Sequence, residues 1–289
     1  MHHGQRRTTQ QQNGQEAKKR HVSTQDVHLG PPHGTDHICR ATRKSQTLLS
    51  PRAWLALSPV TRFFDCMTPI HEDEHLLVLE KPSGLLSVPG RGPDKQDCLS
   101  KRVQAIYPEA LIVHRLDQDT SGLLLMARGI EAQRRLNRLF ETRQVKKRYV
   151  AVVAGHPAQT QAAQAPDEEG WRTIDGPILL DWDRRPIHII HPDGKASRSR
   201  WRALQTGESA TLVELEPVTG RTHQLRVHMQ SVGHPMLGDS LYAPPDIKAL
   251  SPRLMLQAQE LAFPHPFTDL WMDFKITTPW SASVPYLPS

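Results

Sequence analysis

The stretch LIVHRLDQDTSGLLLMA, residues 111–127, decides the fold class because it sets a charged loop between two apolar segments. Residues 111–113 and 123–127 are short apolar runs of the length that buried strands have. The intervening residues 114–122 are polar and end on Ser121-Gly122, which is typical of a loop. The pattern therefore predicts two strands that hold a polar loop between them.

The sequence on either side of this stretch predicts further strands and helices. Apolar runs predict strands at 76–79, 149–154 and 212–215. Helical spacing of apolar residues predicts helices at 97–107, 130–143 and 222–232. Because strands and helices do not alternate regularly, as they would in a doubly wound sheet, the predicted fold class is α+β.

The composition excludes several classes of protein. The 289 residues have a mean hydropathy of -0.52, and no apolar run reaches the roughly 18 residues that a membrane helix needs. The three cysteines, Cys39, Cys66 and Cys98, are widely spaced and form no C-x-x-C pair. A disulfide framework and a cysteine zinc module are therefore not expected, and we expect a reducing, cytoplasmic compartment.

Residues 1–66 differ from the rest of the chain. The whole formal charge of +6 lies in this segment, which is rich in Gln and His and poor in aliphatic side chains up to about residue 47. Such a composition buries too little apolar surface to fold, so we predict disorder. We place one domain at 67–289. The extension is compatible with an organellar targeting peptide or with sequence upstream of a true start at Met67, and we favour the second.

Asp117, in the loop, is the first candidate functional residue. It lies two residues after Arg115, and a carboxylate beside an arginine stays ionised. From spacing alone, a functional role and a structural role as a cap of loop N–H groups are equally supported. Asp119, two residues further on, is expected to cap the loop.

Two other clusters are unusual. The segment GRTHQLRVH, residues 220–228, predicts a helix start with a basic face that is either solvated or lets Arg226 pair with a carboxylate in a pocket. The segment VKKRYV, residues 145–150, places Tyr149 after a basic run, where it is either a core residue or a platform for a planar ligand. The basic run and the arginines of the helix at 130–143 together predict a phosphate-binding stripe.

Two motifs are interpreted as turns. Residues 71–75, HEDEH, match the H-E-x-x-H zinc motif, which requires both histidines on one helix. Here the motif runs directly into the strand predicted at 76–79, so we expect an acidic turn and no metal. The two Gly-His-Pro steps at 155–157 and 233–235 are also interpreted as turns, with Gly233 as a C-cap of the preceding helix.

Three segments, HRLDQDTSG (114–122), KKRYV (146–150) and GRTHQLRVHMQSVGHPMLGDSLY (220–242), resemble the signature regions of the RluA-type pseudouridine synthases, within the RluA/RsuA superfamily. The resemblance covers roughly residues 74–278, and residues 81–91 are among those most similar to the dual-specificity members. It implies the pseudouridine synthase fold, with a central, mostly antiparallel mixed sheet flanked by helices and loops. No S4 domain is expected, and the N-terminal extension resembles nothing in the family.

The resemblance also implies a function. Such enzymes are isomerases that convert uridine to pseudouridine in structured RNA with an aspartate and no cofactor or metal. The dual-specificity members imply an uridine in the tRNA anticodon loop and one in a stem-loop of 23S rRNA as targets. The alternatives are a synthase with a single rRNA or tRNA target and a non-catalytic RNA-binding module. We expect RNA as the partner, no membrane, and a monomer.

Roles for individual residues follow from the matched motifs. Asp117 matches the essential aspartate, and Arg226 matches its basic partner. Tyr149 matches the active-site tyrosine that packs against the target base. Arg115 matches the arginine that fills the space left by the flipped uridine. The residues expected to bind RNA are His114, Arg115, Lys146, Lys147, Arg148, Arg221 and His223.

Overall fold

The computed structural model describes residues 39–41, 68–159 and 165–278. The chain divides into two units, 1–37 and 38–289, and every described residue lies in the second. The strands are β1 (Cys39–Ala41), β2 (His71–Glu72), β3 (Leu76–Lys81), β4 (Ala110–Ile112), β5 (Ser121–Arg128), β6 (Lys146–Ala154), β7 (Arg172–Asp175), β8 (Ile178–Leu180), β9 (His188–Ile190), β10 (Arg198–Thr206), β11 (Ala210–Pro217), β12 (Leu256–Pro264) and β13 (Trp271–Lys275). The helices are α3 (Leu99–Gln104), α4 (Ile130–Glu141), α5 (Gln224–Ser231) and α6 (Pro245–Ala249), with 3-10 turns η1 (Pro93–Lys95) and η2 (Pro157–Gln159).

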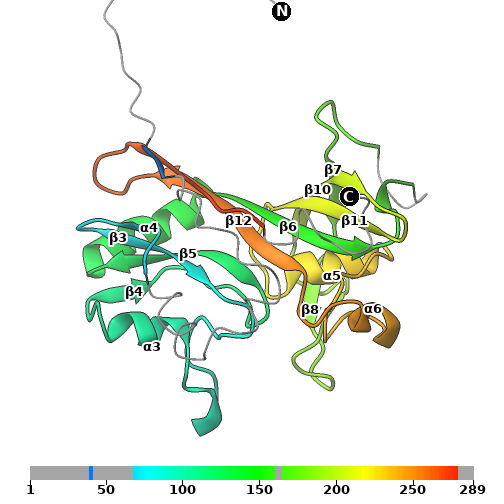
Figure 1. Cartoon of the computed structure of the whole chain (residues 1–289), viewed down its shortest axis with the longest axis horizontal. Coiled ribbons are helices and arrows are strands. Elements are labelled where there is room, and N and C mark those ends of the chain that lie inside the picture. Colours follow the sequence, from blue (N-terminus) through cyan, green and yellow to red (C-terminus); the bar gives the residue numbers. More distant parts are fainter. Residues whose placement is uncertain (1–38, 42–67, 160–164, 279–289) are drawn as a thin grey trace, which may run out of the picture. The chain divides into compact units, whose positions relative to one another are not determined.

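Eleven of the strands in the described part of the chain form one mixed sheet (Figure 1). Its main path has the order β2-β3-β5-β12-β6-β11-β10-β7, with β4 beside β5, and β13 and β1 beyond β12. Within these residues the pairs β5–β12 and β1–β13 are parallel, and the other pairs are antiparallel. The predicted α+β class with a mostly antiparallel sheet is therefore confirmed.

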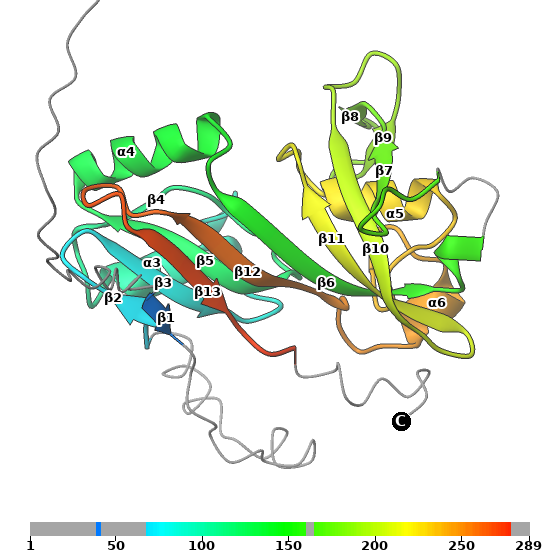
Figure 2. The same cartoon turned by 90° about the horizontal axis from the view of Figure 1, so that it is seen from above.

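The runs 76–79 of β3 and 123–127 of β5 are continuously apolar because both of their faces are covered. Leu76 and Val78 share a core cluster with α4 on one face, while Leu77 and Leu79 share a cluster with α3 on the other. Residues that alternate along a strand point to opposite faces, so a continuous apolar run is what a doubly covered strand requires. Figure 2 shows α4 lying along this part of the sheet.

The helix α5 covers the other part of the sheet. Its Leu225 and Met229 pack with residues of β6, β10 and β11 in one buried cluster. The helix begins at Gln224, two residues later than predicted, because His223 adopts a left-handed conformation with φ 54° and becomes the N-cap. At the other end Gly233, with φ 86°, follows the helix and donates its N–H to the carbonyl of Gln230 (3.0 Å), as expected of a C-terminal glycine.

Two glycines, one in the strand β5 and one in the loop between α5 and α6, let their backbones approach residues 253–258 closely. Gly122 has φ 113°, and a Cβ there would lie 2.2 Å from the carbonyl oxygen of Ala258. Gly238 has φ 73°, and its Cβ would lie 1.9 Å from the carbonyl oxygen of Arg253. Any side chain at either position would therefore collide with the backbone of this shared segment, which leads into the strand β12 that lies between β5 and β6 (Figure 2).

The H-E-x-x-H motif runs through the short strand β2 and the turn to β3, so the predicted turn is found at residues 73–75, while β2 itself was not predicted. His71 and Glu72 belong to β2, and the Oδ1 of Asp73 accepts the N–H groups of His75 (2.7 Å) and Leu76 (2.9 Å) in the turn to β3. Across the described ranges, no group of three or more His, Cys, Asp or Glu side chains is arranged to hold a metal ion.

The N-terminal extension contributes one described element. The strand β1, which lies within the stretch predicted to be disordered, pairs in parallel with β13; the remaining residues up to 67 lie outside the described ranges. Among the described residues, no helix has the length and apolar character needed to cross a membrane.

Candidate active site

A cavity of about 610 Å³ opens where the loop between β4 and β5 meets the start of α5. Its walls come from residues 114–120 of that loop, the end of α4, the start of β6, and the segment between β11 and α5. This volume is within the range of small-molecule sites, roughly 300–1,000 Å³, so a single nucleotide would fit. The structure thus brings together the three segments that the sequence singled out.

Asp117 and Arg226 meet in this cavity. The Oδ2 of Asp117 lies 3.7 Å from the Nη1 of Arg226, and the two side chains are 24% and 2% exposed. The sequence left open whether Arg226 lies on a solvated face or pairs with a carboxylate in a pocket, and the structure places it in the second arrangement. Both residues line the cavity, and the carboxylate of Asp117 is the more accessible of the two.

Arg226 is held by a second carboxylate, that of Asp239. The Nε of Arg226 donates to Oδ2 of Asp239 (2.8 Å) and its Nη2 donates to Oδ1 (2.7 Å), while Asp239 is completely buried. Burial lowers the pKa of Arg226, but the hydrogen bonds and charge of Asp239 and the charge of Asp117 outweigh this effect and raise it above the ordinary value. The guanidinium is therefore a permanent cation with a fixed orientation.

The ring of Tyr242 also contacts the guanidinium of Arg226. The Cζ of Arg226 lies 5.1 Å from the centre of the Tyr242 ring, a distance at which a cation is attracted to an aromatic face. The Oδ1 of Asp239 also accepts the backbone N–H groups of Leu241 (2.9 Å) and Tyr242 (3.1 Å). Asp239 therefore anchors both the arginine and the turn that carries the tyrosine.

Sequence reasoning missed Asp239 and Tyr242, although both lie in the segment 220–242 that it quoted. Neither has a clear local signal, because Gly238-Asp239 is typical of a turn and does not show that the carboxylate is buried. Once the structure shows the burial, the pairing with Arg226 follows, because buried carboxylates are paired.

Lys81 is the third residue that sequence reasoning missed. It is completely buried at the end of β3, and its Nζ donates to the carbonyls of Pro82 (2.8 Å), Leu85 (2.6 Å) and Gln118 (2.9 Å). Three acceptors use all three protons of an ammonium group. Burial lowers the pKa of Lys81 to about 7, although the charges of Asp117 and Asp119 oppose this shift. The lysine thus ties the loop that carries Asp117 to β3.

Tyr149 lies on β6 between Leu215 of β11 and Ala258 of β12, and it lines the cavity. Burial, and to a lesser degree the charge of Asp117, raise the pKa of its hydroxyl well above the ordinary value. The phenol is therefore protonated at neutral pH, which makes it a hydrogen-bond donor beside Asp117 rather than a base.

The two residues before Leu116 have different roles in the structure. Arg115 is exposed, and its Nη2 donates to the Oγ1 of Thr222 across the cavity (3.4 Å). The Nε2 of His114 accepts the N–H of Leu125 (2.9 Å), and its ring stacks on Phe140 at 4.9 Å. Burial, with a smaller contribution from Lys147, lowers the pKa of His114 to about 3. His114 is therefore neutral and holds the loop against β5.

The predicted basic stripe at 146–148 does not form one surface: these residues begin β6, which starts three residues earlier than predicted, and only Lys146 and Lys147 line the cavity. Lys147 lines the cavity, 5.9 Å from the ring of Phe140, and burial lowers its pKa while Glu216 opposes this shift. Lys146 is exposed and lines the cavity, with its Nζ 5.1 Å from the ring of Trp271. Arg148 does not line the cavity.

Arg148 instead joins a structural cluster. Its Nη1 donates to the Oε2 of Glu216 (2.6 Å), and its guanidinium lies 4.4 Å from the centre of the buried Trp171 ring. The same ring is approached by Arg200 and Arg202 of β10. The structure therefore brings Lys146 and Lys147 to the cavity but places Arg148 elsewhere.

Arg221 and His223 both line the cavity at the start of α5. The exposed Arg221 donates its Nε–H to the carbonyl of Ala196 (3.2 Å). His223 lies 2.7 Å through Nδ1 from the hydroxyl of Tyr242, and burial lowers its pKa to about 4 against the opposing charge of Asp117. His228 of the same segment is buried away from the cavity, against Ser199.

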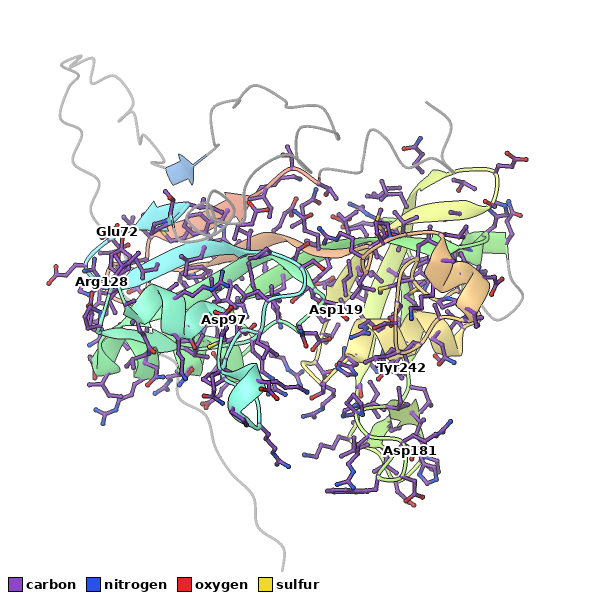
Figure 3. All side chains as sticks on the ribbon, turned by 60° about the horizontal axis from the view of Figure 1, so that its bottom comes forward. Glu72, Asp97, Asp119, Arg128, Asp181 and Tyr242 are labelled. Atoms are coloured by element: carbon purple, nitrogen blue, oxygen red, sulfur yellow. The ribbon has the colours of Figure 1, made fainter. Side chains whose placement is uncertain are left out.

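Asp119 does not take the predicted capping role through its side chain. Its Oδ2 accepts a long hydrogen bond from the hydroxyl of Ser240 (3.4 Å), and its backbone carbonyl accepts the hydroxyl of Ser83 (2.6 Å). Asp119 therefore connects the loop with the turns at residues 83 and 240, at the position marked in Figure 3.

The arrangement combines an accessible carboxylate, a fixed guanidinium and a protonated phenol in one cavity with basic residues at its rim. A carboxylate so placed can attack an electrophilic carbon or accept a proton. Basic rim residues attract a polyanion through its phosphates. The site therefore fits covalent or proton-transfer chemistry on one nucleotide of a larger nucleic acid.

Comparison with known proteins points to one family. A family model described as RNA pseudouridylate synthase matches residues 75–231. The dual-specificity RNA pseudouridine synthase RluA of Yersinia pestis is 44% identical over 211 residues, covering 72% of this chain and 98% of that protein. Its namesake in Escherichia coli K12 is 41% identical over 208 residues, covering 71% and 90%. The solved structure of human RNA Pseudouridylate Synthase Domain Containing 1 matches with a TM-score of 0.60 and 28% identity, covering 74% of this chain and 84% of that one.

Proposed function

This chain belongs to the RluA family of RNA pseudouridine synthases, and from that premise we propose that it modifies two RNAs, a tRNA anticodon loop (uridine-32 type) and a 23S rRNA stem-loop (uridine-746 type). Dual specificity is stated for relatives that are 44% and 41% identical. A uridine must leave its stack to enter the cavity, which costs a few kcal/mol and least in a loop. Unpaired loop uridines are therefore the favoured substrates.

The proposed reaction depends on Asp117. Its carboxylate attacks the ribose–base unit, the bond between C1′ and N1 breaks, and the detached uracil rotates. A bond then forms between C1′ and C5, C5 loses its proton to solvent, and N1 gains one. Two routes satisfy this balance. In one, the carboxylate adds to C1′ as the C1′–N1 bond breaks, and its bond to C1′ breaks again when C5 attacks; in the other, it removes the proton from C2′ to give a glycal and returns that proton when the C1′–C5 bond forms. The isomerisation needs no redox step and no cofactor.

The observation that carries the proposal is the approach of Asp117 to Arg226 inside the cavity, at 3.7 Å between Oδ2 and Nη1. Arg226 orients the carboxylate, because its guanidinium is itself held in place by Asp239. Tyr149 is proposed to pack against the target uracil and to donate a hydrogen bond.

The rim of the cavity is proposed to bind the RNA backbone. Lys146, Lys147, Arg221 and His223 line the cavity, and Arg115 is proposed to fill the space vacated by the flipped uridine. His114 and Arg148 support this surface indirectly, through the loop and the sheet respectively. We place the activity in residues 67–289 and propose a cytoplasmic monomer.

The proposal is tested by tritium release from transcripts labelled at C5 of uridine. We expect the wild-type protein to release tritium from an anticodon stem-loop and from the 23S rRNA stem-loop, without added metal or cofactor, because the C5 proton is lost in the reaction. Release from one transcript only would support the single-target alternative. Retained binding without release from either would contradict the proposed substrates, and transcripts with the loop uridine replaced by cytidine serve as controls.

A further inference from the structure

A hairpin of β8 and β9 carries an exposed aromatic side chain that neither the fold nor the proposed reaction uses. Trp182, in the turn between the two strands, is 66% exposed, more than any other large apolar side chain of the described residues. The hairpin forms a separate two-stranded sheet, and Figure 3 shows it, marked by Asp181, projecting from the rest of the molecule. An exposed tryptophan contributes little burial energy to folding, so the fold itself does not require an aromatic ring at this position.

The turn that presents Trp182 is well defined. The Oδ1 of Asp181 accepts the N–H groups of Asp183 (3.2 Å) and Arg184 (3.1 Å), and its Oδ2 accepts the Nε–H of Arg184 (2.7 Å). The N–H of Asp181 donates to the carbonyl of Ile187 (3.0 Å) and closes the turn. A side-chain carboxylate that binds the backbone in this way fixes the turn, so the aromatic ring is presented by an ordered segment.

A cation lies beside the exposed ring. The Cζ of Arg185 lies 5.1 Å from the centre of the Trp182 ring. Arg184 is paired with Asp181, whereas Arg185 forms no ion pair with any of the described residues. The tip of the hairpin thus presents an aromatic face together with an available positive charge.

The base of this hairpin is attached to the active site. The backbone N–H of His188, at the start of β9, donates to the hydroxyl of Tyr242 (3.0 Å), and the ring of His188 meets that of His223 edge-on at 5.2 Å. Tyr242 in turn supports the guanidinium of Arg226 at 5.1 Å. The hairpin is therefore continuous with the wall of the cavity, and its tip is held at a fixed position relative to Asp117 and Arg226.

We propose that Trp182 and Arg185 form a stacking platform for an unpaired base of the same RNA whose uridine enters the cavity. The inference rests on the proposed function and extends it from the reacting nucleotide to a second one. An aromatic ring with an adjacent arginine is a combination that binds unpaired bases by stacking, whereas a paired base presents no free face. The platform would thus favour RNA loops in which a second base is exposed.

The test measures RNA affinity and chemistry separately. Trp182→Ala should weaken binding of the anticodon stem-loop about tenfold, while the single-turnover rate at saturating RNA changes less than about twofold, because the reacting groups are untouched. Trp182→Phe should recover most of the affinity, since a phenyl ring still stacks. Leu270→Ala, which truncates a 58% exposed side chain between β12 and β13, is the matched control and should bind like the wild type.

A second experiment identifies the stacked base. Loop positions other than the target uridine are made abasic one at a time, and one of them should weaken binding to the wild type but not to Trp182→Ala. Equal losses for both proteins at every position would overturn the proposal, as would unchanged affinity of Trp182→Ala. A change in molecular mass with protein concentration that is abolished by Trp182→Ala would also overturn it, because the tip would then bind a second copy. If the wild type modifies neither RNA, the proposed substrates fail independently of this result.

Discussion

The two sides of the active-site ion pair are built in opposite ways. Asp117 lies on a loop, is 24% exposed, and approaches Arg226 at 3.7 Å through one oxygen. Arg226 lies on a helix, is 2% exposed, and makes two short hydrogen bonds with Asp239 and a ring contact with Tyr242. The cation is thus fixed by the protein itself, while the anion is left accessible to the substrate.

This difference explains how a strong ion pair is avoided at the reacting carboxylate. A short bidentate pair with arginine would occupy both oxygens of Asp117, and the protein gives that arrangement to Asp239 instead. Asp117 receives only the remaining Nη1 at a longer distance, which orients it and leaves it free to react. Because the positive charge of Arg226 is already in position, it needs no rearrangement as charge develops during the reaction. We therefore expect substitutions that release Arg226 and substitutions that remove the carboxylate of Asp117 to have different consequences.

The largest combined effect on stability and turnover is expected from Asp239→Asn, because this substitution removes the carboxylate that fixes Arg226. The substitution leaves Arg226 buried with a neutral partner, and breaking a buried ion pair costs about 3–5 kcal/mol. We expect the free energy of unfolding, measured in urea, to fall by about 3 kcal/mol, and turnover by tritium release to fall at least about tenfold as Arg226 moves.

The control for this variant is Asp175→Asn, which removes the partner of Arg198 in an exposed pair of similar length, 2.6 Å between Nε and Oδ1. Exposed pairs contribute about 0–1 kcal/mol, so this change should be small. If Asp239→Asn destabilised the protein no more than Asp175→Asn, the fixed orientation of Arg226 would not depend on Asp239.

A smaller effect on the free energy of unfolding is expected from a change in pH, because a partly buried, neutral histidine lies near Asp117 and another lies near Arg226. Burial lowers the pKa of His114, near Asp117, to about 3, and that of His223, near Arg226, to about 4. In the unfolded chain both titrate near their ordinary 6.5, so the unfolded state binds protons first as the pH falls. The free energy of unfolding should therefore decrease between pH 6.5 and about 4, by on the order of 2 kcal/mol for each histidine.

Urea titrations at neutral pH and near pH 4.5 measure this decrease. His114→Gln and His223→Gln should each reduce it, since glutamine does not titrate, while the same substitution at the partly exposed His191 should not. A decrease that is unaffected by both substitutions would show that the two histidines are not the groups responsible.

The sequence predicted the elements whose pattern is set locally. The run 76–79 and the stripe of Leu225 and Met229 depend on periodicity alone, and both were found with ends shifted by a few residues. The strand β10 was not predicted, because its arginines are stabilised by partners that are distant in sequence. Arg200 pairs with Glu216 and Arg202 with Glu214, and such cross-strand pairs have no local signal.

The residues of the candidate site also divide into those with a local sequence signal and those without one. Asp117, Tyr149 and Arg226 could be identified because they lie in segments with an unusual local composition and a family resemblance. Lys81 and Asp239 could not, because their importance lies in burial, and burial is a property of the folded chain. The separation of Lys147 from Arg148 follows from the start of β6, which depends on pairing with β12.

The most direct test of the central claim, that an accessible carboxylate at Asp117 performs the chemistry, compares Asp117→Asn with Asp119→Asn on one anticodon stem-loop. Turnover is measured by tritium release and affinity by filter binding. The account predicts that Asp117→Asn loses turnover by at least about a thousandfold with affinity within about threefold of the wild type, because the rim and Arg226 remain. Asp119→Asn should keep most of its turnover, since its carboxylate contacts Ser240. Turnover by Asp117→Asn close to that of the wild type would contradict the account.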